Sequence, residues 1–185
     1  MDFRDGKELI LTELDLVLSA IDEKQINQFV ELITSSRRIF VVGVGRVKLS
    51  LLAFVKRLNH LGIDATYVGA IDEPAIGKSD LLIVGSGSGE TAIPVAISKI
   101  AKKKEANIVH IGSNVSSTVS RNADLLVRIP CKTKLALPDE IDSSQPMSSL
   151  FEQALLLLLD AVALVIIEKR NIDMKELWHT HANLE

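Results

Sequence analysis

The chain has one cysteine and almost no excess of charge. A single Cys in 185 residues allows neither an intramolecular disulfide nor a zinc site built from several cysteines. We interpret Cys131 as a small apolar residue with no chemical role. The net charge is −3 and the pI about 5.8, which excludes the basic surface typical of nucleic-acid-binding domains.

The chain also lacks an obvious membrane or export segment. Its first ten residues are charged and do not contain the apolar region of a signal peptide. The most apolar stretch, residues 154–167, contains Asp160 and is shorter than the ~20 residues that a spanning helix needs. We therefore expect a cytoplasmic protein that does not span a membrane.

Helical and strand-like patterns alternate along most of the chain. Apolar spacing before residue 36 predicts one or two leading helices. Continuously apolar runs then predict five strands, at residues 39–44, 65–68, 81–84, 108–111 and 125–129. The helices expected between them lie at residues 47–61, 74–76, 91–104 and 116–122. Because the strand runs are apolar on both faces, we expect an α/β fold in which helices cover both sides of a parallel sheet.

A loop over residues 131–149 leads to a long C-terminal helix, expected at 149–169. The core of this helix is apolar nearly all round, so it should be buried on more than one side. In so small a domain, we expect a second copy of the chain to provide part of that burial. With no repeat or long linker, the chain forms a single domain over 1–185: leading helices at 1–36, a sheet core at 37–130, and a C-terminal helix and tail at 149–185.

Glycine-rich turns follow two of the predicted strands. The first reads GVGR at 43–46 and the second reads GSGSG at 85–89. In the flavodoxin-like strand order 2-1-3-4-5, the first and third strands are neighbours, and ligands bind in the crevice at their carboxyl ends. The pattern therefore predicts that both turns converge on one site.

The second turn has the chemistry of a phosphate site. Its glycines can expose backbone N–H groups, its hydroxyls can donate hydrogen bonds, and the following helix directs its positive end to the same place. The residues are Gly85, Ser86, Gly87, Ser88, Gly89 and Thr91. One alternative is that Ser88 or Thr91 only caps the helix. A cap needs one hydroxyl, so we favour phosphate binding.

Other phosphate and catalytic motifs fit poorly. The second turn lacks the Lys of a P-loop, and the first has Lys48 where a dinucleotide fingerprint has its third glycine. Asp72 stands about where a ribose-binding acid could lie, but lone acids in loops are common. The G-x-S-x-G and H-E-x-x-H motifs are also absent.

Four segments resemble the SIS (sugar isomerase) domain family, and within it the 6-phospho-3-hexuloisomerase group. They are KRLNHLG at 56–62, GSGSGET at 85–91, QPMSSLFEQ at 145–153 and HANLE at 181–185. The resemblance implies a flavodoxin-like three-layer sandwich with a five-stranded parallel sheet. It also implies a homotetramer with sites near subunit interfaces, and no metal or organic cofactor. The implied reaction interconverts 3-hexulose 6-phosphate and fructose 6-phosphate in the ribulose monophosphate route of formaldehyde metabolism.

The resemblance assigns the catalytic base to Glu152. Spacing alone favours a different role, because Ser149 and Glu152 match a capping box; the family match reverses that preference. His181 and His60 are candidates for an acid–base or ring-opening role. His60 lies ~20 Å along its helix from the site, so it either caps that helix or serves a neighbouring subunit. His181, in the tail, is slightly preferred.

The first turn departs from the family pattern Gly-Ala-Gly-Arg-Ser-Gly. Gly45 and Arg46 are retained and are expected to bind the substrate, but Val47 and Lys48 replace Ser and Gly. Lys48 either adds charge to the site or is solvated on the helix surface. Two alternative functions follow: an isomerase of another ketose or aldose phosphate, and a non-catalytic SIS module that senses a sugar phosphate. The presence of Glu152 favours an enzyme.

Overall fold

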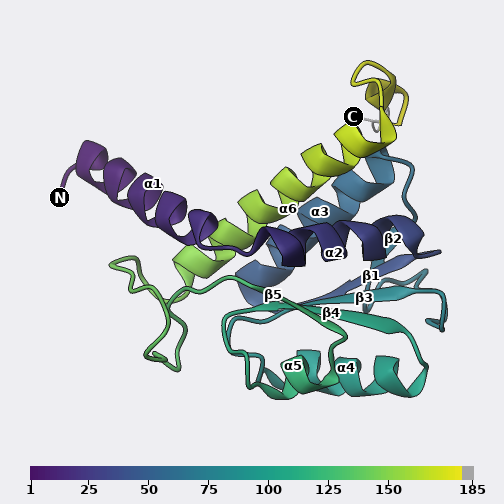
Figure 1. The fold of residues 1–185 in the computed structure, drawn as a ribbon, viewed down its shortest axis with the longest axis horizontal. Helices are drawn as coiled ribbons and strands as arrows, with labels where there is room; N and C mark the ends of the chain where they lie inside the picture. The colour runs from purple at the N-terminus through teal and green to yellow at the C-terminus, as the bar shows by residue number, and fades with distance from the viewer. Residues whose placement is uncertain (181–185) are drawn as a thin grey trace.

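A parallel β-sheet forms the centre of the computed structural model, which describes residues 1–180 (Figure 1). All pairings between its neighbouring strands are parallel, and the strand order is β2-β1-β3-β4-β5. The strands are β1 (Ile39–Val42), β2 (Ala65–Tyr67), β3 (Leu81–Gly85), β4 (Asn107–Gly112) and β5 (Leu125–Arg128). The predicted flavodoxin-like fold is confirmed.

Helices cover both faces of this sheet, as its continuously apolar strands require. Figure 1 shows α2, α3 and α6 on one face and α4 and α5 on the other. Alternate residues of β1 point to the two sides, because Ile39 and Val41 join the larger core cluster while Phe40 and Val42 join the smaller one. The covering helices are α2 (Glu23–Ser35), α3 (Gly45–His60), α4 (Ala92–Lys103), α5 (Thr118–Asn122) and α6 (Ser149–Arg170).

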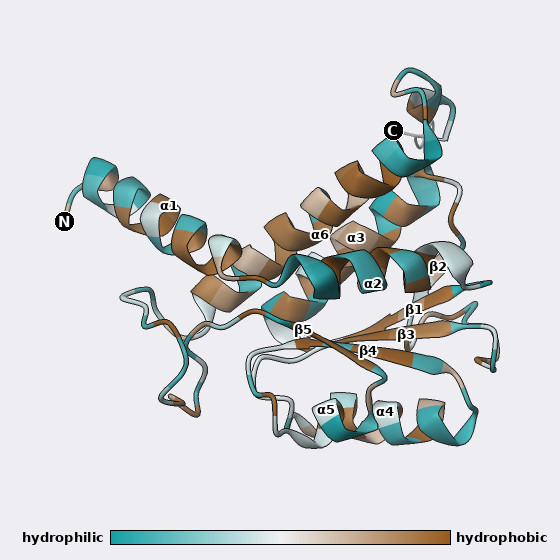
Figure 2. Cartoon of the chain, in the orientation of Figure 1, coloured by the Kyte–Doolittle hydropathy of each residue, from teal (hydrophilic) through white to brown (hydrophobic). Residues whose placement is uncertain are grey.

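Helix α6 is more apolar than the others and is only partly covered (Figure 2). Its 22 residues and mean hydropathy of 2.3 would allow it, by length and composition alone, to cross a membrane. The helix is thus longer than its apolar core at residues 154–167, which is too short to span a membrane. Half of the most apolar 18-residue segment of α6 is buried inside the chain. Core helices of soluble proteins can be equally long and apolar. Leu156, Leu157 and Leu164 remain exposed on its uncovered side.

The N-terminal part of the chain contains two helices, of which α1 (Phe3–Ser19) extends away from the sheet (Figure 1). Leu14 and Val17 are buried where α1 contacts α6. The outer apolar residues of α1 are exposed, including Phe3, Leu11 and Leu16. Helices α1 and α6 therefore carry apolar surface that no described residue covers.

One predicted helix is absent. Residues 74–76 are not helical but belong to a series of turns between β2 and β3. Carboxylates hold these turns: Glu73 accepts a hydrogen bond from the backbone N–H of Gly69, and Asp80 accepts one from Gly77. Three residues cannot form a stable helical turn by themselves, and here side chains satisfy the backbone instead.

We predict that Asp80→Ala destabilises the fold. The Asp80 side chain is fully buried, and it accepts hydrogen bonds from Gly77 N–H and from the Arg37 guanidinium at 2.8–2.9 Å. Removal leaves the Gly77 N–H without its partner and breaks both hydrogen bonds to Arg37, whose exposed guanidinium water then solvates. We expect a cost of about 2–3 kcal/mol in the free energy of unfolding, measured with urea. Asp64→Ala is the control, because the half-exposed Asp64–Arg38 pair contributes about 1 kcal/mol or less. Equal losses in the two variants would contradict this account.

Candidate functional site

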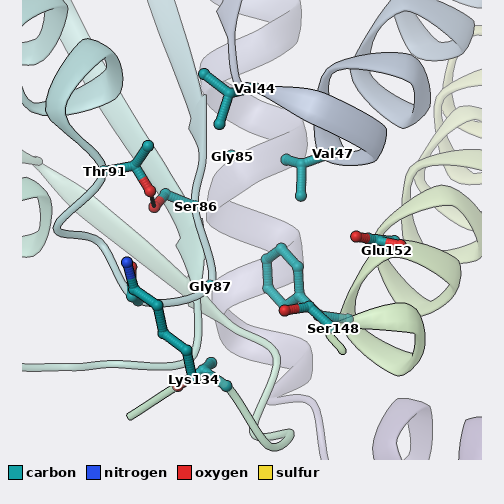
Figure 3. Close-up of a pocket in the computed structure, with 12 residues that line it drawn as sticks. Val44, Val47, Gly85, Ser86, Gly87, Thr91, Lys134, Ser148 and Glu152 are labelled. Carbon is teal, nitrogen blue, oxygen red and sulfur yellow. Dashed lines mark hydrogen bonds between the residues drawn. The ribbon is translucent and has the colours of Figure 1, made fainter. Parts of the chain in front are cut away.

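A pocket of about 170 Å³ opens where β1 and β3 end. Four parts of the chain form it: the two glycine-rich turns, the loop after β5, and the start of α6 (Figure 3). The lining residues are Val44, Val47, Gly85, Ser86, Gly87, Ser88, Thr91, Thr133, Lys134, Ser148, Phe151 and Glu152. The two turns therefore do converge on one cavity.

The turn after β3 presents its hydroxyls to this pocket. Ser86 and Ser88 are largely buried, and the Ser86 hydroxyl lies 3.3 Å from that of Thr91. Thr91 is the N-cap residue of α4, but its side chain makes no capping hydrogen bond. The capping alternative therefore does not account for the Thr91 hydroxyl, which remains directed to the pocket beside the start of α4.

The glycines of this turn have different surroundings. Gly85 and Gly87 line the pocket, whereas Gly89 does not. Gly89 has a φ of +63°, and a Cβ there would lie 2.0 Å from the Ser117 hydroxyl oxygen. Gly89 thus allows the turn to approach the start of α5 closely. Its predicted contact with substrate stays a prediction.

His110 supports the same turn from behind. This fully buried residue of β4 has its Nε2 at 2.9 Å from the Ser86 carbonyl oxygen and its Nδ1 at 2.8 Å from the Ser120 hydroxyl. A neutral imidazole donates from Nε2 to Ser86 and accepts at Nδ1 when the Ser120 hydroxyl points to it rather than to the Asn114 carbonyl oxygen, which lies 2.9 Å from that hydroxyl. Burial lowers the pKa of His110 to about 4, although the contact with Ser86 and the charge of Glu90 oppose that shift.

Glu152 projects from the first turn of α6, on the opposite side of the pocket from Ser86 and Thr91 (Figure 3). The N-cap residue of α6 is Ser148, without a side-chain cap, so Glu152 is one residue too late for a capping box. Its carboxylate forms an ion pair with Arg46 instead. The Ser50 hydroxyl also donates to the Glu152 carbonyl oxygen at 3.0 Å, which attaches α6 to α3.

The first turn supplies apolar surface to the pocket. Val44 and Val47 line it, whereas Gly45 and Arg46 do not. Lys48 does not line the pocket; its side chain is half-buried, and its ammonium lies 5.0 Å from the centroid of the Tyr67 ring, in a cation–π contact. Arg46 reaches the pocket only through its partner Glu152.

Of the two candidate histidines, the structure describes only His60, and it lies away from the pocket. His60 ends α3, some 20 Å along that helix from the pocket. Its carbonyl oxygen accepts a hydrogen bond from Thr180, and its side chain borders a separate hollow with Met174, Leu177 and Trp178. His181 falls outside the described residues. Within residues 1–180, no group of three or more His, Cys, Asp or Glu could hold a metal ion.

The loop after β5 contributes residues to the pocket that no sequence pattern predicted. Thr133, Lys134 and Ser148 line the pocket, although 44 or more positions separate them from the turn at 85–89. No motif marks Thr133 or Lys134, and only folding brings them to the site. Cys131, in the same loop, is buried, and burial raises the pKa of its thiol to about 12, in agreement with a purely structural role.

Comparison with known proteins identifies the family. The SIS domain model matches residues 32–160, which include both glycine-rich turns and Glu152. The chain belongs to the SIS domain family. A protein of Bacillus subtilis named 3-hexulose-6-phosphate isomerase is 39% identical to this SIS domain, over 95% of both chains. One of the same name from Mycobacterium gastri is 35% identical, over 100% of this chain and 92% of the relative.

A solved structure agrees with this assignment. A crystal structure of a hypothetical protein from Methanococcus jannaschii superposes on this SIS domain with a TM-score of 0.84 and 31% identity. The alignment covers 98% of this chain and 99% of the other. Its authors inferred a 3-hexulose-6-phosphate isomerase function for that protein.

We predict that His110 makes stability depend on pH between 7 and 5. In this range the unfolded chain protonates the imidazole, whose ordinary pKa is 6.5, while the folded chain keeps it neutral. The free energy of unfolding should therefore fall by about 2 kcal/mol as the pH falls from 7 to 5, measured by urea titration. His110→Gln should reduce this dependence on pH without abolishing it, because the other three histidines remain. An unchanged slope would contradict the buried neutral imidazole.

Proposed function

We propose that this SIS domain is an isomerase that interconverts 3-hexulose 6-phosphate and fructose 6-phosphate. The proposal rests on one observation: a hydroxyl-rich turn and the Glu152 carboxylate line the same pocket. The turn can bind a phosphate while the carboxylate faces the carbon chain. The names of the B. subtilis and M. gastri relatives support this substrate.

The phosphate would occupy the side of the pocket formed by Ser86, Ser88 and Thr91. Their hydroxyls and the start of α4 offer hydrogen bonds and a partial positive charge. The sugar carbons would then extend toward Val47 and Glu152. With one end of the substrate anchored, the carboxylate acts on a fixed carbon, which is how binding energy contributes to catalysis.

The reaction needs one base acting at two adjacent carbons. In the forward direction the Glu152 carboxylate removes the proton from C2 of the 3-hexulose, and the C3 carbonyl oxygen takes up a proton to give a cis-enediol. Glu152 then returns a proton to C3 while the C2 hydroxyl loses its own and becomes the carbonyl. No net proton or electron is consumed. Arg46 would hold the carboxylate in position, and His181 remains our proposed acid for the oxygens.

A second substrate remains a candidate because of Val47. Where the family has a Ser, this pocket has an apolar β-branched side chain, which removes a hydroxyl donor. This favours a sugar phosphate that needs no hydrogen bond from the side chain at position 47, such as another ketose or aldose phosphate. A sensor without catalysis is less favoured, because it would not need a carboxylate held by Arg46 at the pocket.

We also propose that the protein is soluble and cytoplasmic, acts in the ribulose monophosphate route of formaldehyde metabolism, and assembles as a homotetramer. The exposed leucines of α6 and the apolar residues of α1 supply surface for contacts between subunits. In such an assembly, His60 or His181 of one subunit could approach the pocket of another.

Glu152→Gln should abolish turnover and leave the fold intact. The amide has nearly the same shape but cannot accept the proton, so kcat should fall at least 10²-fold, as for loss of a general base. Conversion of the hexulose phosphate is measured with an auxiliary enzyme system that consumes the fructose 6-phosphate formed and reduces a chromogenic cofactor. Glu168→Gln, on an exposed turn near the end of α6, is the control and should keep wild-type kcat. If kcat of Glu152→Gln stayed near wild type, the assignment of the base would be wrong.

Size-exclusion chromatography with light scattering tests the assembly. The wild-type mass should be about four times the 20.2 kDa of one chain. Charge at the apolar face should prevent association, so we expect Leu157→Glu with Leu164→Glu to give a monomer. Ile71→Glu, in the exposed turns after β2, serves as the control for an added charge. A monomeric wild-type protein would refute the proposal.

A further inference from the structure

The pocket has few positive charges for a ligand as negative as a sugar phosphate. A phosphate monoester carries about −1.5 to −2 at neutral pH, whereas the turn at 85–89 offers neutral donors and the start of α4 about half a positive charge. The two basic residues in and just after the first turn already have partners. Arg46 pairs with Glu152, and Lys48 lies over the Tyr67 ring.

We propose that Lys134 supplies the missing charge and binds the substrate phosphate. Of the described residues that line the pocket, it is the one basic side chain. This inference rests on the proposed function, because it takes the ligand to be a sugar phosphate. It adds to the phosphate site a residue that lies far in the sequence from the glycine-rich turn.

The backbone next to Lys134 is packed directly against the phosphate turn. Thr133 is buried, and a Cβ added to Gly87 would lie only 3.2 Å from the Thr133 methyl carbon. Gly87 therefore permits the close contact between the two segments. From this position the Lys134 side chain runs alongside the turn that carries Ser86 and Thr91 (Figure 3).

Side-chain contacts fix the loop that carries Lys134. The Glu140 carboxylate accepts hydrogen bonds from the Thr133 N–H, the Thr133 hydroxyl and the Leu137 N–H, at 2.9–3.0 Å. Backbone bonds close the base of the loop, because Lys132 N–H donates to Ile141 and Ile141 N–H donates to Pro130. Lys134 thus extends from an ordered loop whose two ends are held together.

Lys134 differs from its neighbour Lys132 in its pairing. Lys132 makes an ion pair with Asp142 at 2.6 Å. Within residues 1–180, no carboxylate forms an ion pair with Lys134, so its exposed ammonium remains available to an anion at the pocket. A lysine on a flexible stem is a compact charge, suited to a phosphate that neutral donors already orient.

Calorimetric titration with inorganic phosphate and with fructose 6-phosphate tests this role. We expect Lys134→Met to raise the Kd of both ligands about tenfold, as for loss of one charge-assisted hydrogen bond. Lys132→Met is the matched control in the same loop and should bind like wild type. Lys134→Arg keeps the charge and should restore most of the affinity. In turnover assays, the effect of Lys134→Met should fall mainly on KM, with kcat less affected.

The outcomes separate this inference from the proposed function. If Lys134→Met and Lys132→Met bind both ligands as wild type does, Lys134 has no such role, whatever the enzyme's substrate. If wild type fails to convert the hexulose phosphate while Lys134→Met still weakens phosphate binding, the proposed function fails and the role of Lys134 stands. If wild type binds neither ligand, both proposals are overturned.

Discussion

Parallel pairing of β1 with β3 brings together the two turns on which the site depends. In this register Val42 lies beside Val84, so the chain leaves both strands at the same edge of the sheet. Helix α3 then covers one face of the sheet and α4 the other (Figure 1). The two helices diverge, which opens a crevice between their starting points. Every other part of the site is added around that crevice.

The sides of the crevice differ in chemistry. The hydroxyls of the glycine-rich turn and the start of α4 form one side, with His110 buried behind them. The other side combines the apolar Val47 with the Glu152 carboxylate, which Arg46 holds. A ligand with an anionic end and a hydroxylated carbon chain matches this division. The hydroxyl-rich side does no bond-making in our account; it fixes where Glu152 meets the carbons.

Local patterns in the sequence were sufficient for the sheet and for the turn at 85–89, because continuously apolar strands and glycine-rich turns are local signals. They failed where individual side-chain contacts decide the outcome. Carboxylates replaced the short helix expected at 74–76, and an ion pair with Arg46 replaced the capping box suggested by Ser149 and Glu152. Lys134 carries no motif, and only the folded loop brings it to the pocket. The family resemblance, rather than spacing, identified Glu152.

In our proposal, this pocket moves a proton between C2 and C3 of a hexulose phosphate. Incubation of the protein with fructose 6-phosphate in D₂O, followed by NMR, tests it most directly. We predict that deuterium enters at C3, the carbon from which Glu152 would remove a proton in the reverse reaction. Exchange at C1 instead would indicate an aldose–ketose isomerase. No exchange at any carbon, with fructose 6-phosphate demonstrably bound, would contradict catalysis and indicate a sensor.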